Sequence, residues 1–233
     1  MAISPLELYK ISTEISDDKK HLNKYTYTGN EFKFPHYRIL SLKELMLSGL
    51  HQRLPLRQKQ FIEEEGEVLL IANIIAGYIP LVQLRSIHGE KRFEVIGSQS
   101  KLFYGQGYLD KNFKFGDWVI IVEGIMDADI GRGLYPNILA TMTSKITKSQ
   151  FEILKLLTNR VILIGDNDKP GRIGTKANRK LLQENGFDVR LIFQYGDFKD
   201  LGDLAEALLN NDGYVFNTAT KYYRSKINNI VNR

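Results

Sequence analysis

Cysteine is absent from this 233-residue sequence, and its absence excludes several kinds of chemistry. The chain can form no disulfide, no thiolate zinc site and no cysteine nucleophile. Histidine is scarce as well, and the four histidines lack the spacing of metal ligands, so we expect no zinc. The longest apolar run, residues 69–82, is too short to span a bilayer and is interrupted by Asn73 and Gly77.

The N-terminal segment MAISPLELYK has no basic stretch followed by an apolar core, so we expect no secretory signal. Together with the short apolar runs, this predicts a cytoplasmic protein without a membrane partner. The formal net charge is +5, which favours a polyanionic partner. A chain of this length can bury a substantial core in one or two domains.

From about residue 116, short apolar runs alternate with amphipathic segments. Thr147 and Gln150 form a T-x-x-Q capping box, which predicts the start of one helix. Such alternation predicts an α/β fold with a parallel sheet flanked by helices. The expected strands are residues 118–122, 161–164 and 189–193, and the expected helices are residues 125–131, a segment from 147, and 173–185.

The rest of the chain is less regular. A helix is expected within residues 42–64, and residues 69–86 and 94–104 have the character of strands, so we expect a basic α+β subdomain here. After Asp212 the tail contains four basic residues and no acidic one. The tail is therefore either an amphipathic helix packed on the body or a contact for nucleic acid.

Two acidic clusters follow apolar runs of the second half. Glu123-Gly124 with Asp127 follows the first run, and Asp166-Asn167-Asp168 follows the second. The carboxyl ends of neighbouring parallel strands meet at one edge of a sheet, so these carboxylates are expected to lie close together. An oxygen-rich site of this kind suits Mg²⁺ or Mn²⁺. Each aspartate taken alone is equally compatible with a turn or a helix cap.

Three segments resemble the motifs of the Toprim domain, in the same order. VEGIMDA is similar to its glutamate-glycine motif, GDNDKPG to its D-x-D motif, and KDLGDL to a later acidic motif of primase and phage-type members. The resemblance covers roughly residues 116–210. It implies that Glu123, Asp166 and Asp168 are catalytic, and that the metal site is lined by Glu123, Asp127, Asp166, Asp168, Asp200 and Asp203.

The segment upstream of Glu123, which ends in GSQSKLFYG, resembles the catalytic core of bacterial-type DNA primases. By this resemblance four basic residues face the template and the incoming nucleotide, although each is also compatible with a solvated strand position. These residues are Arg85, Lys91, Arg92 and Lys101. Bacterial primases usually carry a zinc-binding domain as well, for which this cysteine-free sequence has no ligands.

The sequence is therefore interpreted as a phage-like primase core. We expect a basic α+β subdomain at 1–115, a Toprim domain at 116–210 and a basic tail or helix at 211–233. The implied activity is synthesis of RNA primers on a single-stranded DNA template from nucleoside triphosphates, in the bacterial cytoplasm or a phage-infected cell, with a replicative helicase as a further candidate partner. The alternatives are a Toprim nuclease acting on RNA or DNA and a non-catalytic nucleic-acid-binding replication factor.

Overall fold

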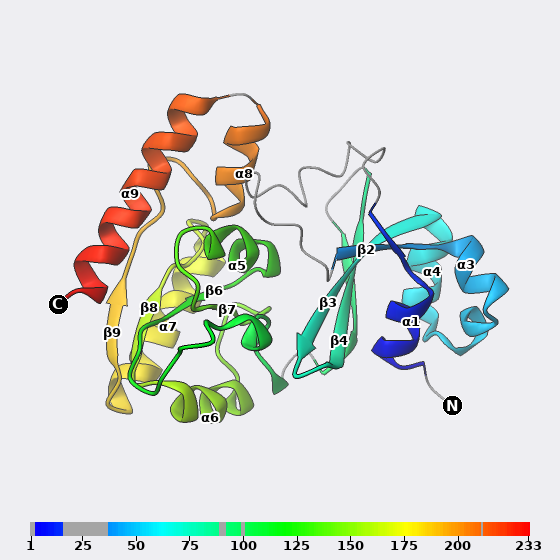
Figure 1. Ribbon diagram of the computed structural model, residues 1–233, viewed down its shortest axis with the longest axis horizontal. Coiled ribbons are helices and arrows are strands. Elements are labelled where there is room, and N and C mark those ends of the chain that lie inside the picture. The colour runs from blue at the N-terminus through cyan, green and yellow to red at the C-terminus, as the bar shows by residue number, and fades with distance from the viewer. Residues whose placement is uncertain (1–2, 16–36, 89–91, 99–100, 211) are drawn as a thin grey trace. The chain divides into compact units, whose positions relative to one another are not determined.

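The structure is a computed structural model that describes residues 3–15, 37–88, 92–98, 101–210 and 212–233 (Figure 1). The chain forms two compact units, Met1–Gln99 and Ser100–Arg233. Within the described ranges, no helix combines the length and the apolar character needed to cross a membrane. Lys91, one of the four basic residues of the sequence prediction, lies outside the described residues.

The first unit is an antiparallel sheet with the strand order β1-β2-β3-β4-β5. Helical segments cover one of its faces, where Leu45, Phe61 and Ile62 pack with strand residues such as Leu70 and Leu84. This unit has the predicted α+β character. Its elements are α1 (Pro5–Ile11), β1 (Thr13–Glu14), β2 (Tyr37–Ser41), α3 (Leu42–Leu47), η2 (Leu50–Arg53), α4 (Leu56–Glu65), β3 (Glu67–Ile75), β4 (Tyr78–Ser86) and β5 (Phe93–Gly97).

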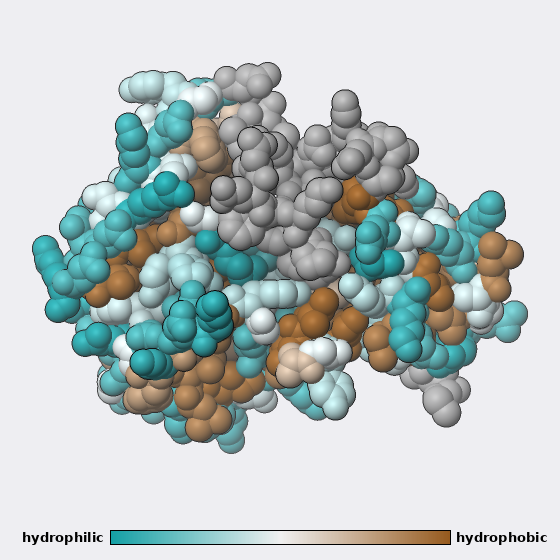
Figure 2. Space-filling model, in the orientation of Figure 1, coloured by the Kyte–Doolittle hydropathy of each residue, from teal (hydrophilic) through white to brown (hydrophobic). Residues whose placement is uncertain are grey.

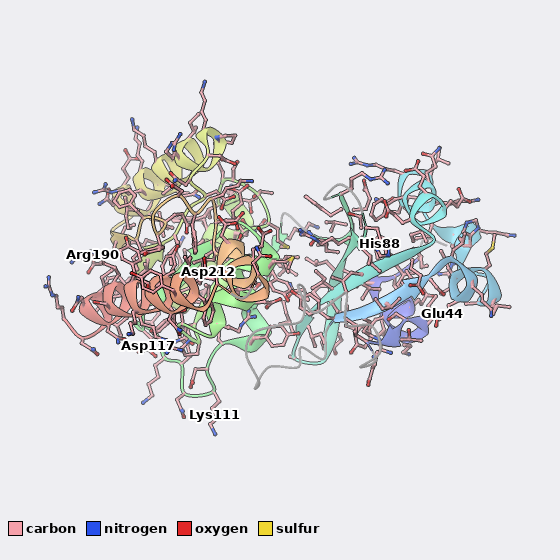
Figure 3. The ribbon with its side chains drawn as sticks, turned by 90° about the horizontal axis from the view of Figure 1, so that it is seen from above. Glu44, His88, Lys111, Asp117, Arg190 and Asp212 are labelled. Carbon is pink, nitrogen blue, oxygen red and sulfur yellow. The ribbon has the colours of Figure 1, made fainter. Side chains whose placement is uncertain are left out.

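The helix expected within residues 42–64 is divided into three segments. Ser41 and Glu44 form the capping box that starts α3 (Glu44 is labelled in Figure 3). Gly49 then adopts a left-handed conformation with φ 71°, and Pro55 precedes α4. A left-handed residue and a proline each interrupt helical hydrogen bonding, so one long helix cannot form here.

The second unit is built on a parallel sheet with the strand order β7-β6-β8-β9. This confirms the predicted α/β fold with its parallel sheet and flanking helices. The elements are η4 (Gln106–Tyr108), β6 (Val119–Val122), α5 (Ile125–Arg132), β7 (Ile138–Ala140), α6 (Lys148–Leu157), β8 (Arg160–Leu163), α7 (Lys169–Glu184), β9 (Asp188–Leu191), α8 (Gly202–Leu209) and α9 (Gly213–Val231).

Helices α6 and α7 supply Leu154 and Leu182 to a core that also contains Val119 and Leu163 of the sheet. Helix α5 packs on β7 and α8, and α8 packs on α9 (Figure 1). Because helices cover its strands, β6 is buried along its whole length, which explains its unbroken apolar sequence. The sheet thus holds the strand ends that carry the acidic residues in a fixed arrangement.

The tail is a helix, α9, with Ala219, Tyr223 and Ile227 buried on its inner side. Figure 2 shows hydrophilic side chains along its exposed side. The Tyr223 hydroxyl accepts a hydrogen bond from the Tyr195 backbone N–H at 3.0 Å, and it donates one to Gln194 at 2.6 Å. These contacts attach α9 to the segment after β9. Of the two alternatives for the tail, the structure therefore shows the amphipathic helix packed on the body.

Residues 101–115 pack with the second unit, whereas the sequence placed the boundary after residue 115. Phe103 and Tyr104 are fully buried, and the backbone of Tyr104 exchanges two hydrogen bonds of 3.0 Å with Ala140 beside β7. The Tyr104 hydroxyl donates to Asp129 at 2.7 Å, and Arg132 forms an ion pair with the same carboxylate. The KLFYG segment is therefore part of the body that carries the acidic strand ends.

The bond between Tyr104 and Asp129 can be tested by Tyr104→Phe. We expect a loss of about 2 kcal/mol in the free energy of unfolding, because a buried hydrogen bond to a charged group is removed. Tyr135→Phe is the matched control, since it removes a hydroxyl that donates to the neutral Trp118 carbonyl at 3.2 Å rather than to a carboxylate. Denaturant unfolding of both variants checks the difference, and equal losses would contradict the assigned role of Asp129.

Candidate active site

Glu123 directly follows β6, a strand paired with β7 on one side and β8 on the other. Its side chain is half-buried at the carboxyl end of the sheet. Burial raises the pKa of Glu123, the nearby Asp168 raises it further, and Lys199 lowers it. The glutamate therefore stands where the sequence predicted it, close enough to the second acidic cluster to interact with it.

Asp127 is a buried residue in the first turn of α5 that connects two distant parts of the chain. One carboxylate oxygen accepts the Gly124 N–H at 3.1 Å, and the other accepts the Gly202 N–H at 3.0 Å. Burial, and after it Asp200 and Asp166, raise the pKa of Asp127 well above its ordinary value, while the two backbone bonds partly offset this. Its geometry is that of a residue that fixes the loop before α8.

Asp168 is the N-cap of α7, where its side chain accepts the Gly171 N–H at 2.8 Å. Its other carboxylate oxygen lies 3.5 Å from the Lys199 Nζ. Asp168 is thus a helix cap, which the sequence analysis considered as an alternative role, and it also forms an ion pair. Because Asp168 starts the helix, α7 begins at Lys169, four residues before the predicted start at Ile173.

Asp166 has a strongly raised pKa. The pKa of this carboxyl rises from 3.8 to about 7, and burial is the largest cause. The carboxylates of Glu123, Asp200 and Asp168 add to this in that order, and Lys199 opposes them. Asp166 thus interacts with an acid from each of the other acidic segments, which is the convergence expected for strand ends at one edge of a sheet.

The KDLGDL segment contributes its acids unequally. Asp200 influences the titration of both Asp127 and Asp166, so it joins the acidic group. Asp203 instead accepts a hydrogen bond from the Lys199 backbone N–H and lies in the first turn of α8. The predicted metal-binding role of Asp203 therefore has less support from the geometry than that of Asp200.

Lys199 is the residue of this site that the sequence analysis missed. Burial lowers its pKa, but Asp200, Asp168 and Asp166 outweigh this and raise the pKa overall. Its side chain is 59% exposed, so it can also reach an anionic ligand. The sequence signal that could have indicated Lys199 is its position immediately before Asp200 in the acidic KDLGDL motif.

The acidic cluster consists of Glu123, Asp127, Asp166, Asp168 and Asp200. Its carboxylate oxygens fit a divalent cation that prefers oxygen ligands. The carboxylates raise one another's pKa values, and Lys199 is the cation that the described residues place against them. In the described part of the chain, no three carboxylate or imidazole groups close on a common point as in an assembled metal site. Mg²⁺ commonly keeps several waters and takes one or two carboxylates, which suits such an open arrangement.

The basic residues predicted to contact nucleic acid lie in different settings. Arg85 is half-buried on β4, and Lys101 is exposed at the start of the second unit. Arg92 forms ion pairs with Glu64 at 2.8 Å and with Glu65 of α4, which raise its pKa. The contact of these residues with the template and the incoming nucleotide stays a prediction.

Comparison with known proteins agrees with this geometry. Residues 120–205 match a family model described as Toprim-like. A DNA primase of Clostridium acetobutylicum is 34% identical over 90 residues, which cover 38% of this chain and 15% of that protein. The chain thus spans about 15% of the length of this relative.

Solved structures of primases share the fold. The Aquifex aeolicus primase, solved with its zinc-binding and RNA polymerase domains, has a TM-score of 0.60 at 15% identity, and the match covers 85% of this chain and 54% of that one. The primase fragment of the bacteriophage T7 primase-helicase has a TM-score of 0.52 at 15% identity, over 89% of this chain and 73% of that one. The second unit therefore contains a Toprim domain, and the chain resembles the primase catalytic core, which confirms the resemblance that the sequence motifs indicate.

The titration of Asp166 predicts how stability depends on pH. Its folded pKa lies above its unfolded value, so its contribution to stability is present below about pH 4 and is lost as the pH rises to about 7. We expect Asp166→Asn to raise the Tm at pH 8 by about 2–4 °C, for about 1 kcal/mol after allowance for solvent screening. Near pH 4 the Tm values should converge.

Mg²⁺ should reduce the difference in Tm between the wild-type chain and Asp166→Asn. At pH 8 the ion should raise the Tm of the wild-type chain, because it neutralises the repelling carboxylates, and it should raise the Tm of Asp166→Asn less. Thermal unfolding with and without the ion measures both. An equal Mg²⁺ response in the two proteins would argue against a metal site that includes Asp166.

Proposed function

We propose that the chain is the catalytic core of a DNA primase, a nucleotidyltransferase that makes short RNA primers on single-stranded DNA. The observation that carries the proposal is the group of interacting carboxylates at the strand ends of a Toprim domain, in a chain that is 34% identical to a DNA primase over 90 residues. The natural setting would be replication in the cytoplasm of a bacterium or a phage-infected cell.

The acidic residues supply the chemistry that nucleotidyl transfer needs. Glu123, Asp166 and Asp168 would hold Mg²⁺ or Mn²⁺, with Asp200 beside them and Asp127 and Asp203 as the weaker candidates. When bound, the ion would neutralise charge on the transferring phosphate and orient the triphosphate. Glu123 would accept a proton or share in ion binding, and Lys199 would contact an anionic oxygen of the substrate from its exposed position.

The proposed partners are a single-stranded DNA template and nucleoside triphosphates. The net charge of +5 favours both, since each is a polyanion. A replicative helicase is a further proposed partner, because the T7 relative is a fragment of a primase-helicase protein. Zinc has no part in this proposal, because the sequence contains no cysteine.

Neutralising the central acids tests the proposal. Asp166→Asn and Asp168→Asn should each reduce primer synthesis by at least about 100-fold, because each substitution weakens the ion that stabilises the transferring phosphate. The assay supplies single-stranded DNA, labelled nucleoside triphosphates and Mg²⁺ or Mn²⁺. Binding of the DNA should persist, since a loss of negative charge reduces repulsion of the template.

Asp188→Asn is the matched control for that assay. Asp188 is an exposed residue of β9 that pairs with Arg190 at 3.0 Å, outside the acidic cluster, so primer synthesis should stay at the wild-type level. Metal-dependent cleavage without incorporation would replace primase with a Toprim nuclease. The absence of both reactions on several templates and with both metals would favour a non-catalytic binding factor.

A second test concerns the four basic residues. Their combined replacement by alanine should weaken single-strand binding and reduce its salt dependence, with a fall of up to about 3 in the slope of log K against log salt. Fluorescence anisotropy across a salt series measures both. The four residues are Arg85, Lys91, Arg92 and Lys101.

The control removes the same charge elsewhere. Four exposed lysines of the second unit serve this purpose, among them Lys111, whose side chain extends into solvent in Figure 3. If both quadruple variants lose affinity equally, binding follows net charge, and the predicted role of the four basic residues is wrong. The control lysines are Lys111, Lys114, Lys145 and Lys148.

A further inference from the structure

The second unit contains a cavity of about 360 Å³ between α7 and the end of β9. Its volume lies in the range of pockets that hold one small organic ligand. One end lies at Asp166 and Asn167, and the walls extend along α7. The lining residues are Leu163, Gly165, Asp166, Asn167, Arg172, Thr175, Lys176, Arg179, Leu191, Ile192, Phe193 and Gln194.

Three basic residues of α7 line one wall at spacings of four and three residues, which places them on one side of the helix. The Arg172 guanidinium is already hydrogen-bonded within the chain, because it donates to the Asn167 carbonyl at 2.8 Å and to the Asn167 side chain at 3.1 Å. Lys176 and Arg179 are exposed, and the structure shows no ion pair for either among the residues it describes. Two neighbouring cations thus face the cavity.

The opposite wall is apolar and ends in an aromatic ring. Leu163 and Leu191 come from β8 and β9, and Phe193 follows β9 with 73% of its surface exposed. Gln194 holds this segment in place, because it donates to the Gly165 carbonyl at 3.0 Å and accepts from the Tyr223 hydroxyl. An exposed ring on a fixed backbone offers a flat surface on which a base can stack.

The two ends of the pocket differ in charge. Asp168 caps α7, so Lys176 and Arg179 lie eight and eleven residues along the helix, or roughly 12 and 16 Å from the cap at 1.5 Å per residue. The cations are therefore far from the acidic cluster, whereas Asn167 lies between two of its aspartates in the sequence. A ligand with an anionic end and an aromatic end would fit in one orientation.

We propose that this pocket binds a free nucleotide, with the base on Phe193 and the phosphates between Lys176 and Arg179. The proposal goes beyond primer synthesis, because binding here requires neither a divalent ion nor the acidic cluster. Asp166 lines both the cavity and the acidic cluster, so a bound nucleotide lies beside the proposed catalytic centre and could control access to it.

The test measures binding to the full chain in EDTA. N-methylanthraniloyl-ATP and -GTP are titrated by fluorescence anisotropy, and unlabelled ATP should compete. Adenosine should compete at least about 10-fold less well than ATP, because it lacks the charge that the two cations bind. Competition by adenosine as strong as that by ATP would overturn the phosphate assignment.

Substitutions then locate the site. Lys176→Ala with Arg179→Ala should weaken binding at least about 10-fold, and Phe193→Ala should weaken it about 10-fold through the loss of stacking. The matched control is Lys148→Ala with Lys180→Ala, which removes two exposed charges of α6 and α7 that do not line the cavity. It should change affinity less than about 2-fold, and equal losses in the two double variants would overturn the proposal.

A second ligand separates a free nucleotide from a nucleic-acid strand. A labelled deoxythymidine decamer is titrated under the same conditions, and the proposal expects its affinity to be insensitive to Lys176→Ala with Arg179→Ala. If this variant loses the decamer and not the nucleotide, the pocket belongs to a strand path and the proposal is wrong. Glu123→Gln distinguishes the two functions, because Glu123 belongs to the acidic group and does not line the cavity. It should reduce primer synthesis and leave nucleotide binding in EDTA intact.

Discussion

The buried carboxylate of Asp127 is the interaction on which the rest of the site depends. It accepts the N–H groups of Gly124, at the end of β6, and of Gly202, at the start of α8. A β-carbon at Gly124 would lie 2.4 Å from the carboxylate, and one at Gly202 would lie 2.7 Å from Asp200. A side chain at either glycine would therefore displace a carboxylate of this group. One buried acid thus sets the position of Asp200 relative to the strand that carries Glu123.

Holding these acids together costs stability, and the cost explains the other features of the site. Burial and mutual repulsion raise the pKa values of Glu123, Asp127 and Asp166. The fold compensates with backbone N–H donors. The N–H group of Gly171 donates to Asp168, and the N–H groups of Gly124 and Gly202 donate to Asp127. Lys199 adds one exposed positive charge that lies against Asp168. A divalent ion would neutralise the remaining excess of negative charge. A group of carboxylates that destabilises the fold without an ion is therefore suited to bind one.

The sequence predicted the parallel sheet and the acidic strand ends because both depend on local pattern. An unbroken apolar run such as Val119–Val122 indicates a strand covered on both faces, and the acid after it must lie at the sheet edge. Features set by tertiary contact were not predictable. The pairing of Tyr104 with Ala140, which joins residues 101–115 to the second unit, and the ion pair of Lys199 with Asp168 both link segments distant in sequence. The start of α7 was missed because Asp168 was interpreted as a ligand and is also a cap.

Helix α7 contributes residues both to the acidic cluster and to the cavity beside β9. Gly171, Gly174, Asn178 and Leu182 are its buried residues, and a β-carbon at Gly174 would lie 2.2 Å from the Ser144 carbonyl, so the helix approaches the body too closely for any larger residue. This contact fixes the rotation of α7 about its axis. Its N-terminal end is then fixed at the acidic cluster, and Lys176 and Arg179 necessarily face the cavity beside β9. Substitutions on the buried side should therefore disturb both sites together, whereas those on the cavity side can change ligand binding alone.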